Sequence, residues 1–489
     1  GDYNTAIGYE ALTNQTGVSG ETANTAIGYK AGNSITTGVK NIFIGRSAGA
    51  SSTDVDFAIG IGWAALNGVL TSAADGIVCI GNSSGNNVTT AARIVGVGDG
   101  TFQRAASQQS DSVAIGYQAL NGIPAGTCEK NVAIGVYSMN VNQTHVTNNT
   151  GVGYQSLRYL AGSTSNYNSA FGADAGMSIT AGSYNTAIGS GVLGEASGNA
   201  ITGDFNTGVG NLALYNAEGT VNANTAIGYR AGFGATTASG SVLIGYQAGD
   251  NITTASGSVF IGVDAGGNVQ TGNMNIGIGY NAFHNAATGD NNIAIGVNAG
   301  DAVTSGTLNI LIGKNTGGAI DSGHENVAVG ANALLSATTA GYTVAIGNSA
   351  MAGAVTTGDS NTGVGASTLY YNTSGHENVG VGHFAGFYNV TGENNTYVGY
   401  SAGKGASGQS NSYNTGVGHN SLKSITDGGY NVALGSRSGE DLTTGDFNVF
   451  VGDYAGHATT DGDKLIAIGH SALAANVTSD GDGTVAIGY

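Results

Sequence analysis

A short motif recurs along the whole chain. Its form is Asn-Thr-Ala-Ile-Gly-Tyr-x-Ala-Leu/Gly, as in the segments Asn4 to Leu12 and Asn24 to Gly32. When each copy is numbered from its central glycine, taken as position 0, there are 28 copies between Gly8 and Gly488 of the 489 residues. Sixteen of the 27 intervals are 17 residues long, and the longest is 21. This unbroken period predicts one stacked unit per copy and a single continuous repeat domain over residues 1–489. The motif at both ends indicates a segment of a longer fibre.

The residues before the central glycine have the composition of a β-strand. Position −1 is Ile, Val, Leu or Phe in all 28 copies, and position −3 is Thr, Val or Ile in 27. A short β-branched run that ends at glycine is typical of a strand followed by a turn. The 87 glycines and the missing 3.6-residue period exclude helix, and a single proline excludes collagen. The fold class is therefore all-β, a β-solenoid of about 28 coils, each with room for about two short strands and two turns.

Positions −2 and +4 vary together. Position −2 is Ala, Gly or Cys in 22 copies and large in six, and all six of those copies have Gly at +4. We infer that −2 and +4 fill one shared volume inside a narrow coil, because a close-packed interior holds one large side chain there, not two. The six large residues are Phe43, Leu243, Phe260, Leu311, Tyr397 and Phe450.

Positions −1 and −3 point to the opposite face of the strand, since side chains alternate along a strand. An apolar stripe of this length needs a cover. The simplest cover is another copy of the chain, and we expect a closed three-fold bundle, a homotrimer. The alternative is a single solenoid with a wider coil that buries both sets of side chains.

The stacked pattern resembles a known family. Asn131-Val132-Ala133-Ile134-Gly135, Ser112 to Gly116 and Asn292 to Gly296 are similar to the head-domain repeats of trimeric autotransporter adhesins, and to repeat regions of phage tail fibres. The resemblance covers essentially the whole chain. It implies a left-handed parallel β-roll that forms an intertwined or side-by-side homotrimeric fibre.

The function expected from this resemblance is the structural or adhesive shaft of an extracellular trimeric fibre. Such a shaft holds or forms a receptor-binding surface on a cell or virion, and its partners are its own copies together with host-cell glycans or surface proteins. The alternative is a phage tail fibre or tailspike segment that binds or cleaves polysaccharide. A bacterial and a phage owner both stay open.

Composition excludes several other classes. The net charge of −18 argues against nucleic acid and against anionic membranes as partners. Matches to G-x-G-x-x-G/A, as at Gly60 to Ala65, arise wherever Gly occupies −2 and lack the required helix. The eight histidines show no metal-ligand spacing, and acidic pairs such as Asp461/Asp463 and Asp480/Asp482 miss the EF-hand pattern. We therefore assign no catalytic, cofactor-binding or metal residue and expect no enzyme activity and no cofactor.

The residues assigned a structural role are the −4 asparagine, the −1 apolar residue and the central glycine. Asn occupies −4 in 19 copies, and its amide can bond to the same amide one coil above and below. Representative sets are Asn4, Ile7 and Gly8; Asn131, Ile134 and Gly135; Asn292, Ile295 and Gly296; and Asn431, Leu434 and Gly435. Cys79 occupies −2 as a small buried filler, and no bridge to Cys128 is expected.

Repeat length follows position +4. After Gly at +4 the next interval is 17 residues in 12 of 13 cases, and after Leu, Met or Phe in only 4 of 14. A large residue there is expected to plug the coil and anchor a longer loop. The candidate ligand-binding loops follow Leu12, Leu66, Leu120, Leu157 and Leu193.

Overall fold

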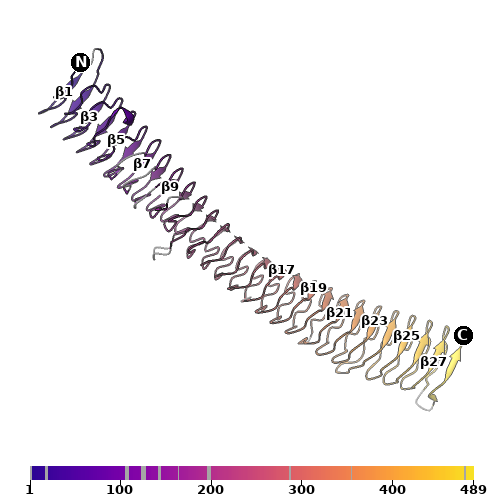
Figure 1. The fold of residues 1–489 in the computed structure, drawn as a ribbon. Coiled ribbons are helices and arrows are strands. Elements are labelled where there is room, and N and C mark those ends of the chain that lie inside the picture. The colour runs from indigo at the N-terminus through magenta and orange to yellow at the C-terminus, as the bar shows by residue number, and fades with distance from the viewer. Residues whose placement is uncertain are drawn as a thin grey trace. The chain divides into compact units, whose positions relative to one another are not determined.

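The computed structural model describes residues 3–16, 20–104, 109–122, 128–140, 145–162, 165–194, 200–285, 288–353, 355–477 and 481–489. The chain divides into two compact units, Gly1–Thr254 and Ala255–Tyr489. The repeat runs through both units (Figure 1). The assignment of residues 1–489 to one continuous domain remains a prediction.

Every described strand is three residues long and occupies positions −3 to −1 of one repeat. In the first unit the strands are β1 (Thr5–Ile7), β2 (Thr25–Ile27), β3 (Ile42–Ile44), β4 (Ile59–Ile61), β5 (Val78–Ile80), β6 (Val95–Val97), β7 (Val113–Ile115), β8 (Val132–Ile134), β9 (Thr150–Val152), β10 (Ser169–Phe171), β11 (Thr186–Ile188), β12 (Thr207–Val209), β13 (Thr225–Ile227) and β14 (Val242–Ile244). A 3₁₀ turn, η1, spans Ser72–Ala74.

The second unit repeats the same arrangement. Its strands are β15 (Val259–Ile261), β16 (Ile276–Ile278), β17 (Ile293–Ile295), β18 (Ile310–Ile312), β19 (Val327–Val329), β20 (Val344–Ile346), β21 (Thr362–Val364), β22 (Val379–Val381), β23 (Thr396–Val398), β24 (Thr415–Val417), β25 (Val432–Leu434), β26 (Val449–Val451), β27 (Ile466–Ile468) and β28 (Val485–Ile487).

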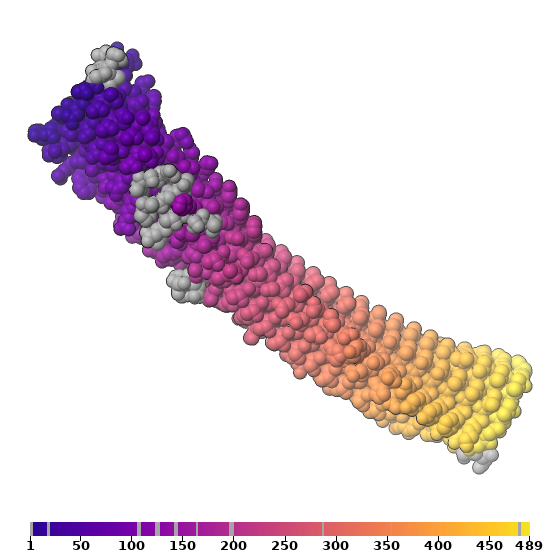
Figure 2. Space-filling model, in the orientation of Figure 1, coloured from indigo at the N-terminus to yellow at the C-terminus, as the bar shows by residue number. Residues whose placement is uncertain are grey.

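Successive strands within each unit pair in parallel and in register. In the pair β17–β18, Ile293 lies beside Ile310, Ala294 beside Leu311 and Ile295 beside Ile312. Each repeat position therefore stacks on the same position of the next coil. In Figure 2 the surface of the second unit, coloured orange to yellow, shows equivalent side chains aligned in rows. The predicted all-β, parallel β-solenoid is confirmed.

The expectation of two strands per coil is wrong. Outside the named strands, the described residues contain only isolated bridges, such as Ile179 with Ile201 and Ile201 with Gly219. The reason is backbone geometry, because positions −5, +2 and +4 adopt left-handed conformations, as at Tyr430 (φ 58°) and Arg437 (φ 54°). Such residues turn the chain and interrupt a strand. The return segments still hydrogen-bond from coil to coil.

The coil interior holds the side chains predicted for it. The middle residue of every strand, position −2, is buried except in β1 and β28. A Cβ atom added to Gly456 would lie 2.5 Å from Cδ1 of Phe450, and one added to Gly266 would lie 2.4 Å from Cγ of Phe260. The large ring at −2 therefore occupies the space that a side chain at +4 would need. The predicted shared volume is confirmed.

Positions −3 and −1 point out of the coil. In every strand except β1 and β28, position −3 is half-buried and −1 is half-buried or exposed, so neither set belongs to the interior. The alternative of a wider coil that buries both sets is therefore wrong.

The −4 asparagines form the predicted ladder. Asn292 is fully buried, and its Nδ2 donates to Oδ1 of Asn275 at 3.2 Å and to the carbonyl of Gly306 at 2.8 Å. Its Oδ1 accepts from the backbone N and the Nδ2 of Asn309, both at 3.0 Å. Each side chain thus links its own coil to the coils before and after it.

Position 0 requires glycine for two reasons. Gly296 has a φ of 136°, which side chains of L-residues rarely tolerate, and an added Cβ would lie 2.4 Å from the carbonyl oxygen of Gly313 in the next coil. Close stacking of consecutive turns therefore leaves no room for a methyl group.

Both cysteines are buried free thiols. Cys79 fills position −2 as predicted, and its burial raises the pKa of the thiol to about 12.

Candidate functional site

The first candidate is the outward face of the strands, here called the strand face and made of the −3 and −1 side chains of every coil. It carries no charged residue in any of the 28 coils. Its side chains remain partly accessible in the single chain, with Phe171 43% and Leu434 40% exposed. The strand face is an apolar stripe that the chain does not cover with its own residues.

Charge is also nearly balanced along the borders of the strand face, positions −5 and +1. These borders hold six of the 13 basic residues and five of the 31 acidic ones, a net charge of +1. All other positions together carry seven basic and 26 acidic residues, a net charge of −19. The charged border residues are Lys40, Arg46, Arg93, Lys130, Lys314 and Lys464 against Asp99, Asp111, Glu325, Glu377 and Asp453. The negative charge of the protein therefore lies away from this face.

The −5 border carries two ladders of stacked aromatic rings. In the first ladder, Tyr167, Tyr184 and Phe205 stack at centroid distances of 5.0 and 5.1 Å, with interplanar angles of 7°. In the second ladder, Tyr413, Tyr430 and Phe447 stack at 4.7 and 4.9 Å, with angles of 4° and 9°. All six side chains are between 43% and 60% exposed.

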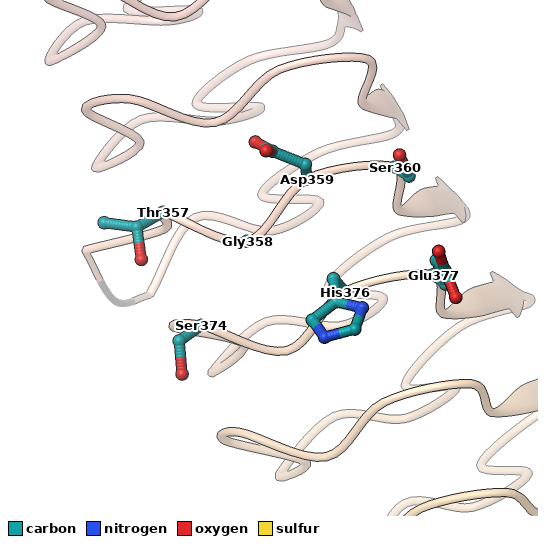
Figure 3. Close-up of a pocket in the computed structure, with 7 residues that line it drawn as sticks. All are labelled: Thr357, Gly358, Asp359, Ser360, Ser374, His376 and Glu377. Atoms are coloured by element: carbon teal, nitrogen blue, oxygen red, sulfur yellow. The ribbon is translucent and has the colours of Figure 1, made fainter.

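The second candidate is a set of shallow pockets between −9 and −5 of consecutive coils. The pocket in Figure 3 measures about 470 Å³ and takes Thr357, Gly358, Asp359 and Ser360 from one coil, and Ser374, His376 and Glu377 from the next. Two others at equivalent positions measure about 510 and 380 Å³. One repeated edge of the solenoid is thus hollowed, with a mainly polar lining at the Figure 3 pocket and a more apolar lining, which includes Phe57 or Met274, at the other two.

Two of the three titratable side chains that line the Figure 3 pocket, Asp359 and His376, already have partners. Asp359 Oδ1 accepts a hydrogen bond from the backbone N of Gly341 at 2.7 Å. His376 Nε2 lies 2.6 Å from Oε2 of Glu393, whose Oε1 accepts from the hydroxyl of Tyr413 at 2.9 Å. The remaining hydroxyls of the lining suit a hydroxyl-rich ligand better than a charged one. No group of three His, Cys, Asp or Glu side chains suited to a metal ion occurs within the described ranges.

The loop after Leu66 borders one of these pockets. That pocket is lined by Phe57, Ser72, Ala73, Asp75, Gly76, Ala92 and Arg93. The side chain of Leu66 itself is buried in the coil, as are those of Leu120, Leu157 and Leu193, so these leucines are interior plugs and not ligand contacts. Leu12 is half-buried. Parts of the loops after Leu12, Leu120, Leu157 and Leu193, together with Asp480, lie outside the described residues.

A charged cluster that the sequence analysis did not predict surrounds Glu440. This carboxylate is nearly buried and receives Asn420 Nδ2 at 3.0 Å, Lys423 Nζ at 3.2 Å and His457 Nε2 at 3.2 Å, with Arg437 Nε at 3.7 Å. The signal in the sequence was present, because Lys423, Glu440 and His457 all occupy position +5 of successive coils. Opposite charges stacked at one repeat position stabilise adjacent coils.

No family model and no curated protein matches the chain significantly. Among the described residues, no helix is long and apolar enough to cross a membrane.

Proposed function

We propose that the chain is a shaft segment of an extracellular homotrimeric fibre, a left-handed β-roll trimer that holds or forms a receptor-binding surface. The observation that carries the proposal is the strand face, an uncharged apolar stripe left partly exposed on each unit of the single chain. Contiguous exposed apolar surface of this kind marks an interaction site.

The charge distribution and the regular coil spacing of the chain both favour a second copy of the chain as the partner that covers the strand face. Two chains of net charge −18 repel each other unless they meet where the charge is balanced, and the strand face with its borders is such a place. A partner with the same coil spacing also meets the stripe in phase along its whole length. The three-fold symmetry and the left-handed coil come from the resemblance to adhesin head domains.

The test of assembly uses a charge on the strand face. Ile295 is half-buried in the single chain, so Ile295→Asp keeps its carboxylate partly hydrated in a monomer but buries it in a trimer, where an unpaired charge is costly. We expect wild type to be a trimer and Ile295→Asp to be a folded monomer by native mass spectrometry and circular dichroism. Ser305→Asp, which adds the same charge at an exposed residue away from the strand face, should stay trimeric. A wild-type chain that is a stable monomer or dimer contradicts the proposal.

The hollowed edge supports a second candidate, a fibre segment that binds polysaccharide. The observation that favours it is the polar lining of the Figure 3 pocket. Ser360→Trp together with Ser374→Trp should fill this pocket and reduce binding in a glycan array. Unchanged glycan binding by this double variant would contradict a role of the pocket in polysaccharide binding. The release of reducing ends from a bound glycan would show that the protein also cleaves it.

A further inference from the structure

We propose that the first aromatic ladder, Tyr167–Tyr184–Phe205, sets the axial register between copies of this chain by docking on position +1 of the neighbouring copy at the same level. The inference rests on the proposed trimer and deepens it, because it names the contact that aligns the chains.

The strand face alone cannot set this register. Its coils are alike, and seven consecutive intervals from Gly228 to Gly347 are all 17 residues. A slip of one coil places Ile and Val on Ile and Val again and loses contacts only at the ends. Repetitive apolar seams of this kind need an irregular element to define the alignment.

The ladder is such an irregular element, and its geometry suits a protein partner. The ring faces are covered by one another at 5.0 and 5.1 Å, so mainly edges remain exposed. A sugar ring stacks on an aromatic face, which this arrangement does not offer along its length. A flat row of ring edges with the spacing of the coils fits side chains of another chain with that same spacing.

Symmetry identifies the surface that meets the ladder. The strand separates position −5 from position +1, so these two positions lie on opposite borders of the strand face. In a cyclic trimer with the strand faces towards the axis, contacts away from the axis join different surfaces of neighbouring chains. The −5 border of one chain then meets the +1 border of the next, and rotation without translation keeps both at the same level.

The residues at +1 leave room for the rings when the copies are in register but not when they are displaced by one coil. Tyr or Trp occupies +1 in 10 of the 28 coils, but the three ladder coils have Ala173, Ser190 and Asn211 there. The coils directly before and after carry Tyr154 and Tyr229, which are 49% and 41% exposed. A slip of one coil in either direction therefore drives an end of the ladder against a tyrosine ring.

The first experiment is disulfide trapping with Tyr184→Cys and Ser190→Cys in the same chain. An intrachain bond is excluded because the intervening strand β11 spans roughly 10 Å, beyond the Cα separation of about 7 Å that a disulfide allows. The two natural cysteines are buried. We expect oxidation to give a covalent trimer on a denaturing gel without reductant. The shifted control, Tyr184→Cys with Asn211→Cys, should give none.

The second experiment places a large ring at position +1, which the ladder of the neighbouring copy is proposed to contact. Ser190→Trp should weaken assembly about tenfold or more, since it places a ring where Tyr184 docks. Ala366→Trp makes the same change where position −5 is the small Ser360, and it should assemble normally. A trimer that does not cross-link through Tyr184→Cys and Ser190→Cys, or that tolerates Ser190→Trp as well as Ala366→Trp, overturns the register proposal. A wild-type monomer overturns the proposed function instead.

Discussion

At the level of single residues, the coil depends on two positions whose role is to let consecutive coils approach each other. Glycine at position 0 removes the Cβ that would strike the next coil, as the 2.4 Å distance at Gly296 shows. Asparagine at −4 then joins the coils with hydrogen bonds in a fully buried place. Without these bonds its polar atoms would be buried without partners, at a cost of about 1–3 kcal/mol each.

Replacement of a ladder asparagine should therefore follow a graded series. Asn292→Ala leaves the backbone N and Nδ2 of Asn309 without their acceptor and the carbonyl of Gly306 without its donor. We expect a loss of about 2–4 kcal/mol in the free energy of unfolding. Asn292→Ser should cost less, because Ser258 Oγ accepts from the backbone N of Asn275 at the equivalent place.

Denaturant unfolding measures both variants of Asn292. The control is Asn298→Ala, which removes a half-buried asparagine of the same coil outside the −4 ladder. It should cost less, about 1 kcal/mol, because Ala tolerates the left-handed φ of 52° less well than Asn and the Nδ2 bond to Asn315 is lost. Equal losses at Asn292 and Asn298 would refute the special role of the ladder.

The buried thiol of Cys79 predicts a pH effect. Burial raises the pKa of the folded thiol to about 12, while the thiol of the unfolded chain ionises near pH 9. The favourable contribution to stability is complete below pH 9 and is lost as the pH rises towards 12, by up to about 1.4 kcal/mol per pH unit. Cys79→Ala, which installs the common −2 residue, should flatten this loss relative to wild type. Parallel stability curves for the two proteins between pH 8 and pH 11 would contradict the assignment.

At the level of the element, a large side chain fills the interior of most coils from one of two places, position −2 or position +4, and in seven of the 27 coils with a +4 residue both positions are small. In one coil the side chain is Phe450 at −2, opposite Gly456, and in the next it is Leu473 at +4, opposite Ala467. Both solutions satisfy close packing. The turn is left-handed in both cases, with φ of 49° at Leu473 and 61° at Gly456, and glycine adopts this conformation without strain.

A double-mutant cycle tests this exchange. Phe450→Ala should cost about 3–5 kcal/mol through the cavity it leaves. Gly456→Leu should also destabilise, because its Cβ would lie 2.5 Å from the Phe450 ring. The double variant recreates the Ala467/Leu473 pairing of the following coil and should recover much of the loss. Additive effects in thermal or denaturant unfolding would mean that the two positions do not share a volume.

At the level of the whole molecule, the uninterrupted repeat predicts a long particle. Twenty-eight coils at about 4.8 Å each give a length of roughly 130 Å. Small-angle scattering should therefore yield a maximum dimension of about this value. A maximum dimension below about 100 Å, as for a compact globular assembly of the same mass, would contradict the prediction.

Sequence reasoning reached most of the fold because its determinants are local and periodic. The strand at −3 to −1, the interior volume shared by −2 and +4, and the ladder that contains Asn292 all follow from residue types at fixed spacing. The outward direction of Ile295 followed from alternation along the strand. These features recur in most coils, so the pattern remains clear even where a single coil departs from it.

The tertiary structure alone decided those contacts between coils that the repeat motif does not contain. The stacking of Tyr167, Tyr184 and Phe205 joins residues 17 and 21 positions apart, because the coils between them differ in length. The partners of Glu440 likewise come from neighbouring coils. The single strand per coil reflects left-handed residues such as Tyr430, whose side chains give no sign of that backbone conformation. Backbone conformation at such positions is set by stacking on the adjacent coil, and only the folded chain brings that neighbour into place.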